Sequence, residues 1–258
     1  MDRAKQIWED LGEKDAYFAV AAYDEFREGN LDDEAKEKFF QTGKDHVEEL
    51  WREIERNFEI TFTPGRSLDY GCGVGRVLMP LAEKSDSVVG VDISRAMLNE
   101  ARKNCSERDL QNVELQDSDE FMNAESKKYD FVHSFIVLQH IAPKLGNEII
   151  RKMTERLTTG GVGMVHVTFF DKTPAFRGFR AKVYRDVPFV HRFISVIRGK
   201  DGRFMPMHEY DLNAVFQILN ENGCNDLFVR FSDHGFLGVK IFFRKAETSK
   251  ENYQRMHE

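Results

Sequence analysis

Two acids and three glycines in the chain have the types and spacing that bind a nucleoside. Asp69 ends a short apolar run, the glycines follow at Gly71, Gly73 and Gly75, and a β-branched run ends at Asp92. Glycines let a loop turn sharply and let its backbone approach a ligand closely. An acid at the tip of a second parallel strand can accept hydrogen bonds from both hydroxyls of a ribose. The pattern therefore predicts a strand, a tight loop and a helix that bind a ribose-containing cofactor.

The glycine spacing discriminates between two classes of cofactor. A dinucleotide site requires G-x-G-x-x-G, with the helix N-terminus facing a pyrophosphate. Here the pattern is G-x-G-x-G followed by Arg76, and Asp69 lies two residues before the first glycine. A carboxylate at that position is unfavourable beside pyrophosphate but favourable beside a cationic ligand. S-adenosylmethionine, which carries a sulfonium and an ammonium group, therefore fits the pattern better than a dinucleotide.

Two segments, LDYGCGVGR and VVGVDIS, resemble the first two motifs of the class I S-adenosylmethionine-dependent methyltransferases. The resemblance extends over residues 60–170. It implies an α/β fold with a Rossmann-like, seven-stranded, mostly parallel sheet that has helices on both faces and a last strand inserted antiparallel. It also implies that S-adenosylmethionine, or its product S-adenosylhomocysteine, contacts Asp69, Gly71, Cys72, Gly73, Gly75, Asp92, Ile93, Met97, Ser118, Asp119 and Ser134.

Within this set the resemblance implies particular contacts to the adenine. Met97 would lie near the ring, and Asp119 would accept a hydrogen bond from the exocyclic amine, because a carboxylate only accepts hydrogen bonds. Asp117 is an alternative to Asp119 at this position.

The elements that must position these residues divide the chain into five segments. Helical periodicity predicts an N-terminal helical region over the mouth of the cofactor loop. Asp32 is the predicted N-cap of a helix that has Gly43 as a candidate break, and Ser94 is the predicted N-cap of the helix after Asp92. The tip of the fourth predicted strand, residues 128–134, would lie beside the transferable methyl group. Gly160 to Gly163 are expected to form a turn before a buried fifth strand. The segments are a helical cap (1–60), a cofactor-binding core (61–170), a basic aromatic lid insertion after the fifth strand (171–210), the completion of the sheet (211–245) and a charged tail (246–258).

The insertion differs in composition from the rest of the chain. Residues 171–203 hold nine Lys or Arg against three acids, with aromatic residues between them, whereas the whole chain has a net charge of −7. The segment is open to four interpretations: a lid over the substrate, a selector of anionic substrates, a peripheral contact with an anionic membrane, or a solvated face over an ordinary helical core. We favour the lid, with a face that recognises anions.

Length and composition exclude several classes of function. A chain of 258 residues can form one large α/β domain or a core with an appended piece. The net negative charge argues against binding to nucleic acid, which requires a basic surface. The absence of a signal-like segment and of a long apolar run predicts a cytoplasmic protein. Three separated cysteines without a C-x-x-C pair indicate neither a disulfide framework nor a metal site.

Histidines at loop positions are the candidate catalytic bases. The fourth strand is not followed by N-P-P-Y or D-P-P-Y, the sequence used to methylate exocyclic amines, and it lacks the acids of a magnesium-assisted site. An imidazole titrates near neutrality and can take a hydroxyl proton. The candidates are His140, then His208 with Tyr210, then His234. His133 and His166 lie within strands and are expected to be packed, hydrogen-bonded residues.

Together these patterns predict a methyltransferase that acts on a small-molecule acceptor, by O-methylation with a histidine base. Two alternatives remain. One is a non-catalytic S-adenosylmethionine-binding scaffold or sensor. The other is a methyltransferase that acts on a lipid-linked or membrane-surface acceptor.

Overall fold

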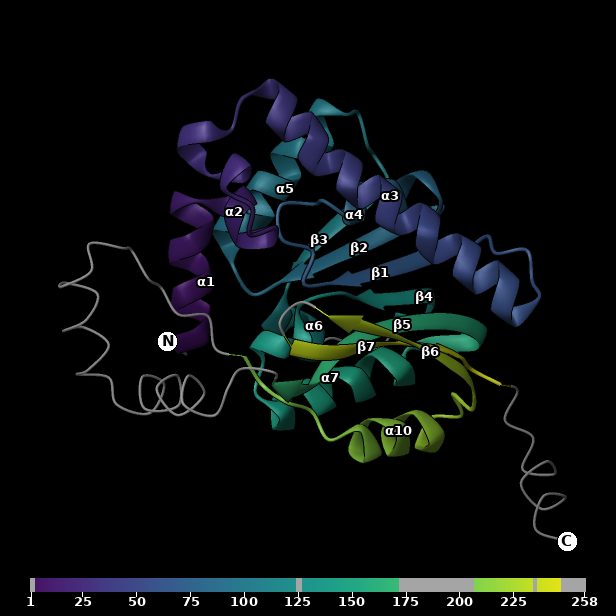
Figure 1. The fold of residues 1–258 in the computed structure, drawn as a ribbon. Coiled ribbons are helices and arrows are strands. Elements are labelled where there is room, and N and C mark those ends of the chain that lie inside the picture. The colour runs from purple at the N-terminus through teal and green to yellow at the C-terminus, as the bar shows by residue number, and fades with distance from the viewer. Residues whose placement is uncertain (1–2, 124–126, 172–206, 234–235, 247–258) are drawn as a thin grey trace, which may run out of the picture.

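A single sheet of seven strands runs through the centre of the computed structural model, which describes residues 3–123, 127–171, 207–233 and 236–246 (Figure 1). The strand order is β3-β2-β1-β4-β5-β7-β6. The strands are β1 (Arg66–Tyr70), β2 (Ser87–Asp92), β3 (Val113–Asp117), β4 (Tyr129–Ser134), β5 (Leu157–Asp171), β6 (Asp226–Asp233) and β7 (Phe236–Arg244). The pairs among β1 to β5 are parallel, and β7 is antiparallel to both β5 and β6. The predicted seven-stranded sheet with an antiparallel last strand is confirmed.

Helices cover both faces of the sheet (Figure 1). One layer contains α1 (Arg3–Lys14), α2 (Ala16–Val20), α3 (Asp33–Phe58), α4 (Leu78–Glu83) and α5 (Arg95–Glu107), with the short 3-10 turns η1 (Asp24–Phe26) and η2 (Glu28–Asn30). The other contains α6 (Ser118–Asn123), α7 (Pro143–Glu155) and α10 (Leu212–Glu221), with η3 (Leu138–His140) leading into α7. Each layer packs its own apolar cluster against the sheet, so the N-terminal helical region is part of one core.

Capping side chains begin the helices where the sequence predicts. The Asp32 carboxylate accepts a hydrogen bond from the backbone N–H of Ala35 at the start of α3, and the Ser94 hydroxyl accepts one from Met97 N–H at the start of α5. The central strands β1, β2 and β4 are almost wholly buried, as expected for parallel strands covered on both faces. These local signals fix where the elements next to the glycine loop begin.

Glycines at two places in the chain do not form the break and the turn that the sequence predicts. α3 continues unbroken through Gly43, where a Cβ would overlap the backbone carbonyl of Arg76. Gly43 is thus a point of close approach between α3 and the glycine loop, and the prediction of a break was wrong. The predicted turn at Gly160 to Gly163 is also wrong, because these residues belong to β5. Gly163 pairs with Phe243, whose ring fills the space that a side chain would occupy.

The predicted lid insertion and the charged tail fall almost wholly outside the described residues, as does His234. No helix within the described ranges combines the length and the apolar character needed to cross a bilayer.

Candidate functional site

A cavity of about 730 Å³ lies at the carboxyl ends of β1, β2 and β4, where parallel strands of this kind of sheet bind ligands. The structure brings most of the predicted site residues to its wall. Those lining the cavity are Asp69, Gly71, Cys72, Gly73, Asp92, Ile93, Met97, Ser118, Asp119, His140 and His208. Gly75, Ser134 and Tyr210 are not among the lining residues.

The glycine loop forms one wall with its backbone. The N–H groups of Gly71 and Cys72 both donate to Val91 O, at 2.7 and 3.0 Å, so that the loop folds back on the end of β2. Gly71 has φ of 82° and Gly73 has φ of 52°, which is the left-handed region. A Cβ on Gly71 would overlap the side chain of Val137, and one on Gly73 would lie 2.7 Å from Val20. Both positions therefore require glycine on two independent grounds.

Asp92 lies at the tip of β2 with its carboxylate held by the loop. Its Oδ2 accepts from Gly73 N–H at 2.9 Å, and its Oδ1 accepts from Ser94 N–H at 2.9 Å. Burial raises the pKa of this carboxyl to about 6, although the hydrogen bonds from Ser94 and Gly73 act to lower it. Each carboxylate oxygen can accept more than one hydrogen bond, so Asp92 can still accept donors from a ligand in the cavity.

Asp69 and Arg76 present buried polar atoms that have no partner. Asp69 is 3% exposed; its Oδ1 lies 2.8 Å from His133 Nδ1, and its Oδ2 has no hydrogen bond. Arg76 donates from Nη1 to Thr42 Oγ1 at 3.3 Å, whereas its buried Nε has no acceptor. Burial lowers the pKa of the Arg76 guanidinium, and the charge of Asp69 acts in the opposite direction. A buried polar group without a partner is costly, which makes both atoms candidate ligand contacts.

Among the cavity-lining residues in the described part of the chain, Asp69 Oδ2 and Arg76 Nε are the buried side-chain polar atoms that have no hydrogen bond. One atom accepts hydrogen bonds and the other donates them, and their charges are opposite. The cavity wall is therefore suited to a ligand that carries both a cationic donor and an anionic acceptor.

Helix α1 closes the cavity on the side opposite the strands. Lys5 donates to both Asp117 and Asp119, at 3.2 Å each, and the Glu9 carboxylate accepts from the N–H groups of Arg95 and Ala96 at the start of α5. Both acids considered for the adenine amine, Asp119 and Asp117, are thus paired with the same lysine.

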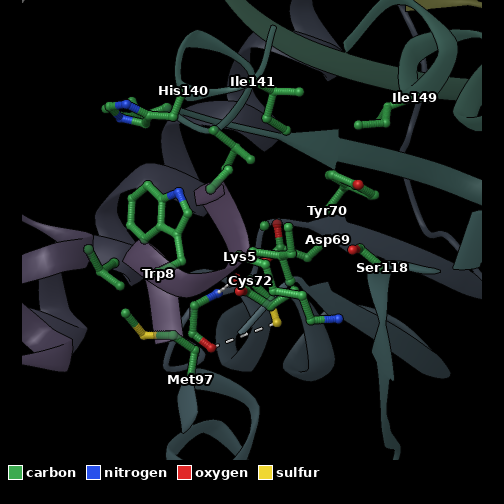
Figure 2. A pocket seen from close by; sticks show the side chains of 18 of the residues that line it. Lys5, Trp8, Asp69, Tyr70, Cys72, Met97, Ser118, His140, Ile141 and Ile149 are labelled. Atoms are coloured by element: carbon green, nitrogen blue, oxygen red, sulfur yellow. Dashed lines mark hydrogen bonds between the residues drawn. The ribbon is translucent and has the colours of Figure 1, made fainter. Parts of the chain in front are cut away.

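Three histidines line the cavity, namely His133, His140 and His208, and His140 lies against an aromatic ring. The ring centroids of Trp8 and His140 are 5.4 Å apart in an edge-on arrangement. Figure 2 shows Trp8 and His140 on one side of the cavity, with Asp69 and Ser118 on the other. Gln139 contacts both His140 and His208. Its amide nitrogen lies 3.1 Å from His140 Nε2, and its backbone carbonyl accepts from His208 N–H at 2.8 Å.

Tyr210 and Ser134 bind the backbone beside the site. The Tyr210 hydroxyl donates to Leu138 O at 2.8 Å and to Ile141 O at 3.0 Å, and burial raises its pKa. These bonds hold the turn that carries His140. Ser134 donates from Oγ to Tyr70 O at 3.0 Å.

The backbone just after β4 is strained. Ile136 has φ of 59°, which is unfavourable for a β-branched residue, and it lines the cavity. Such strain occurs preferentially at functional sites. It turns the chain away from β4 and towards η3, which carries His140.

His133 and Arg76 are site residues that the sequence did not identify. His133 was expected to be packed and hydrogen-bonded within its strand; it is buried and bonded, and it also lines the cavity. It reaches Asp69 because the two residues are register partners in the pair of β1 with β4. Arg76 stands directly after the glycines, and that position was the one available signal for it.

Comparison with known proteins agrees with this geometry. Residues 68–161 match the model of a methyltransferase domain. Aklanonic acid methyltransferase DauC from Streptomyces is 50% identical over 56 residues, which are 20% of this chain and 26% of the relative. A ubiquinone biosynthesis O-methyltransferase from Coxiella burnetii is 28% identical over 155 residues, covering 60% of this chain and 62% of the relative. The chain thus matches less than two thirds of the length of either relative.

A solved structure resembles almost the whole chain. Magnesium protoporphyrin IX methyltransferase from Synechocystis, with bound S-adenosylmethionine, has a TM-score of 0.56 and 19% identity, covering 95% of this chain and 98% of the other. Residues 68–161 thus match a methyltransferase domain, and the chain has the fold of the class I S-adenosylmethionine-dependent methyltransferases.

Proposed function

We propose that this protein transfers a methyl group from S-adenosylmethionine to an oxygen atom of a small-molecule acceptor. The observation that carries the proposal is the pair of partnerless buried atoms, Asp69 Oδ2 and Arg76 Nε, on the wall of the cavity that Asp92 also lines. The methionine end of the cofactor has an ammonium group for Asp69 and a carboxylate for Arg76. Its ribose hydroxyls can donate to Asp92. A pyrophosphate would satisfy Arg76 but would leave Asp69 facing a like charge.

The residues of the cavity can support methyl transfer by position and by exclusion of water. S-adenosylmethionine supplies a methyl group on a sulfonium centre. When the methyl carbon is transferred, S-adenosylhomocysteine is the neutral sulfide that leaves. Apolar surface in the cavity comes from Trp8 and Phe135, and we expect it to keep water from the acceptor. Alignment of two reactants can lower a barrier by ~7 to 11 kcal/mol in well-oriented reactions. A base that removes the hydroxyl proton adds typically ~10² to 10⁴ in rate.

His140 is our first candidate for that base and His208 our second. Both line the cavity, and the turn after β4 that carries His140 is the one the family resemblance places nearest the methyl group. Oxygen as the acceptor is further supported by the similarity to O-methyltransferases of ubiquinone biosynthesis. The similarity to a methyltransferase of aklanonic acid supports a small-molecule acceptor. The apolar and aromatic wall suits an acceptor with a ring system.

The experiment that tests the proposal measures binding before turnover. Calorimetry should detect S-adenosylmethionine and S-adenosylhomocysteine but not NAD. Formation of S-adenosylhomocysteine should then depend on an acceptor from a panel of phenols and carboxylic acids. No heat of binding with either S-adenosyl compound would refute the proposal, and binding without turnover across the panel would favour a scaffold or sensor.

Asp69→Asn is expected to weaken binding of S-adenosylhomocysteine by about ten- to a hundredfold, because a charged hydrogen bond contributes ~1.5 to 3 kcal/mol. Asparagine has nearly the same shape and can still accept from His133 Nδ1, so the fold should be retained. Affinity for 5′-methylthioadenosine, which lacks the amino-acid end, should be unchanged. Calorimetry with both ligands checks this, and equal losses for the two would place Asp69 away from the ammonium group.

Binding should also depend on pH through Asp92. The carboxyl without ligand has a pKa of about 6, and the ribose hydroxyls donate to its ionised form. Below pH 6 the ligand must displace a proton, so affinity should fall as the pH decreases through 6 and should be constant above about pH 7. Calorimetry in buffers of different ionisation enthalpy should detect proton release near pH 5.5. Affinity that rises on acidification would contradict this assignment.

A further inference from the structure

Three buried polar side chains, from elements far apart in the sequence, form a continuous chain that runs from the cavity wall into α3. His46 Nε2 of α3 lies 3.1 Å from His133 Nε2 of β4, and His133 Nδ1 lies 2.8 Å from Asp69 Oδ1 of β1. Their exposed fractions are 9%, 1% and 3%. The His46 ring is stacked on Phe135 with centroids 4.3 Å apart and an interplanar angle of 18°. The stacking fixes the plane in which His46 can form a hydrogen bond.

The chemistry of the groups determines where the protons lie. The Asp69 carboxylate can only accept, so it is hydrogen-bonded to His133 only in the tautomer that carries the proton on Nδ1. In a neutral His133 the Nε2 is then an acceptor, and His46 Nε2 must be the donor that faces it. His46 is held neutral because burial lowers its pKa far below the usual value, and the neighbouring His133, Arg76 and Lys240 lower it further. His166 acts in the same direction.

We propose that His46 is a positioning residue that holds His133 in the tautomer with its proton on Nδ1, so that Asp69 keeps its hydrogen bond from His133 and directs Oδ2 at the amino group of the cofactor. In the other tautomer the Nδ1 lone pair would face the carboxylate. Asp69 would then lose its hydrogen bond and would have to rotate away. The inference rests on the proposed function, because it assigns the ligand that Oδ2 meets.

The same helix also holds the second charged group of the cavity wall. Thr42, one turn before His46, accepts from Arg76, and Gly43 lies against the Arg76 backbone. α3 therefore contacts Arg76 directly and Asp69 through His133. In this view the N-terminal helical region is part of the cofactor site as well as its cover.

The test compares His46→Phe, which keeps the stacked ring but lacks the donor, with His46→Gln, which keeps an N–H donor. The ¹⁵N signals of His133 in the unliganded protein, identified by their loss in His133→Gln, report its tautomer. Calorimetry with S-adenosylhomocysteine and 5′-methylthioadenosine separates an effect on the amino-acid end from an effect on the whole cavity. Thermal unfolding checks that each variant is folded.

We expect protonation at Nδ1 of His133 in the wild type and in His46→Gln, and a mixture of tautomers in His46→Phe. His46→Phe should lose about tenfold or more in affinity for S-adenosylhomocysteine and nothing for 5′-methylthioadenosine, whereas His46→Gln should stay within about threefold of wild type. An unchanged tautomer in His46→Phe, or an equal loss for both ligands, would overturn the inference. If the wild type bound neither ligand, the proposed function would fail, whereas the tautomer measurement would still decide the role of His46.

Discussion

Replacing Asp92 by alanine is expected to raise the Kd for S-adenosylhomocysteine by at least about a hundredfold. Two hydrogen bonds from the ribose hydroxyls to a carboxylate contribute ~1.5 to 3 kcal/mol each, and 1.4 kcal/mol corresponds to a factor of ten. The carboxylate also accepts from the N–H groups of Gly73 and Ser94, so the variant should lose order in the glycine loop as well. Calorimetry at pH 8, where Asp92 is ionised, measures the loss.

Asp92→Asn is the matched control for this change. The asparagine amide oxygen can still accept from one of the two backbone N–H groups. The substitution also removes a carboxylate whose pKa is raised by burial. Thermal stability of the unliganded Asn variant at pH 8 should therefore equal or exceed that of the wild type, while its affinity for S-adenosylhomocysteine is reduced. An alanine variant that binds as tightly as wild type would show that Asp92 does not contact the ribose.

Replacing His140 by alanine is expected to lower kcat by ~10² to 10⁴ with little effect on binding of S-adenosylhomocysteine. The side chain lies across the cavity from Asp69, so its loss removes a proton acceptor without removing a contact to the proposed cofactor groups (Figure 2). Steady-state kinetics and calorimetry on the same preparation separate the two effects.

His208→Ala is the control for the His140→Ala variant. Both histidines line the cavity and both are tied to Gln139, through a side chain in one case and a backbone N–H in the other. If His140 is the base, the pH dependence of kcat should lose its acidic limb in His140→Ala and keep it in His208→Ala. The reverse result would assign the base to His208, and two unchanged profiles would exclude both.

The parts of the site formed within one short segment could be predicted from the sequence. The strand, glycine loop and helix between Asp69 and Asp92 are local, since turn glycines and the ends of apolar runs mark them directly. The caps Asp32 and Ser94 were predicted for the same reason. The seven-stranded sheet with its antiparallel last strand followed from the family resemblance, because periodicity alone does not specify which strands are neighbours.

Contacts between distant segments could not be predicted in this way. His133 and Asp69 are 64 positions apart, and His46 and His133 are 87 apart, so their meeting depends on strand register and helix packing. A glycine within a helical pattern normally indicates a weak point or a break in the helix. Gly43 instead lies within an unbroken helix, where the opposing backbone of Arg76 leaves no room for a side chain. That contact could not be seen in the local sequence. Tyr210 was a candidate for catalysis by its proximity to His208, yet its hydroxyl binds carbonyls of residues about 70 positions away.

The close approach of α3 to the core has a practical consequence for anyone preparing shortened versions of this protein. Phe39, Val47 and Ile54 are fully buried in the same apolar cluster as Leu78 and Val88, and Gly43 leaves no gap at the contact. Deleting the first sixty residues would expose that cluster to water and invite aggregation. The region matched to known methyltransferase domains is thus smaller than the unit that buries this apolar core.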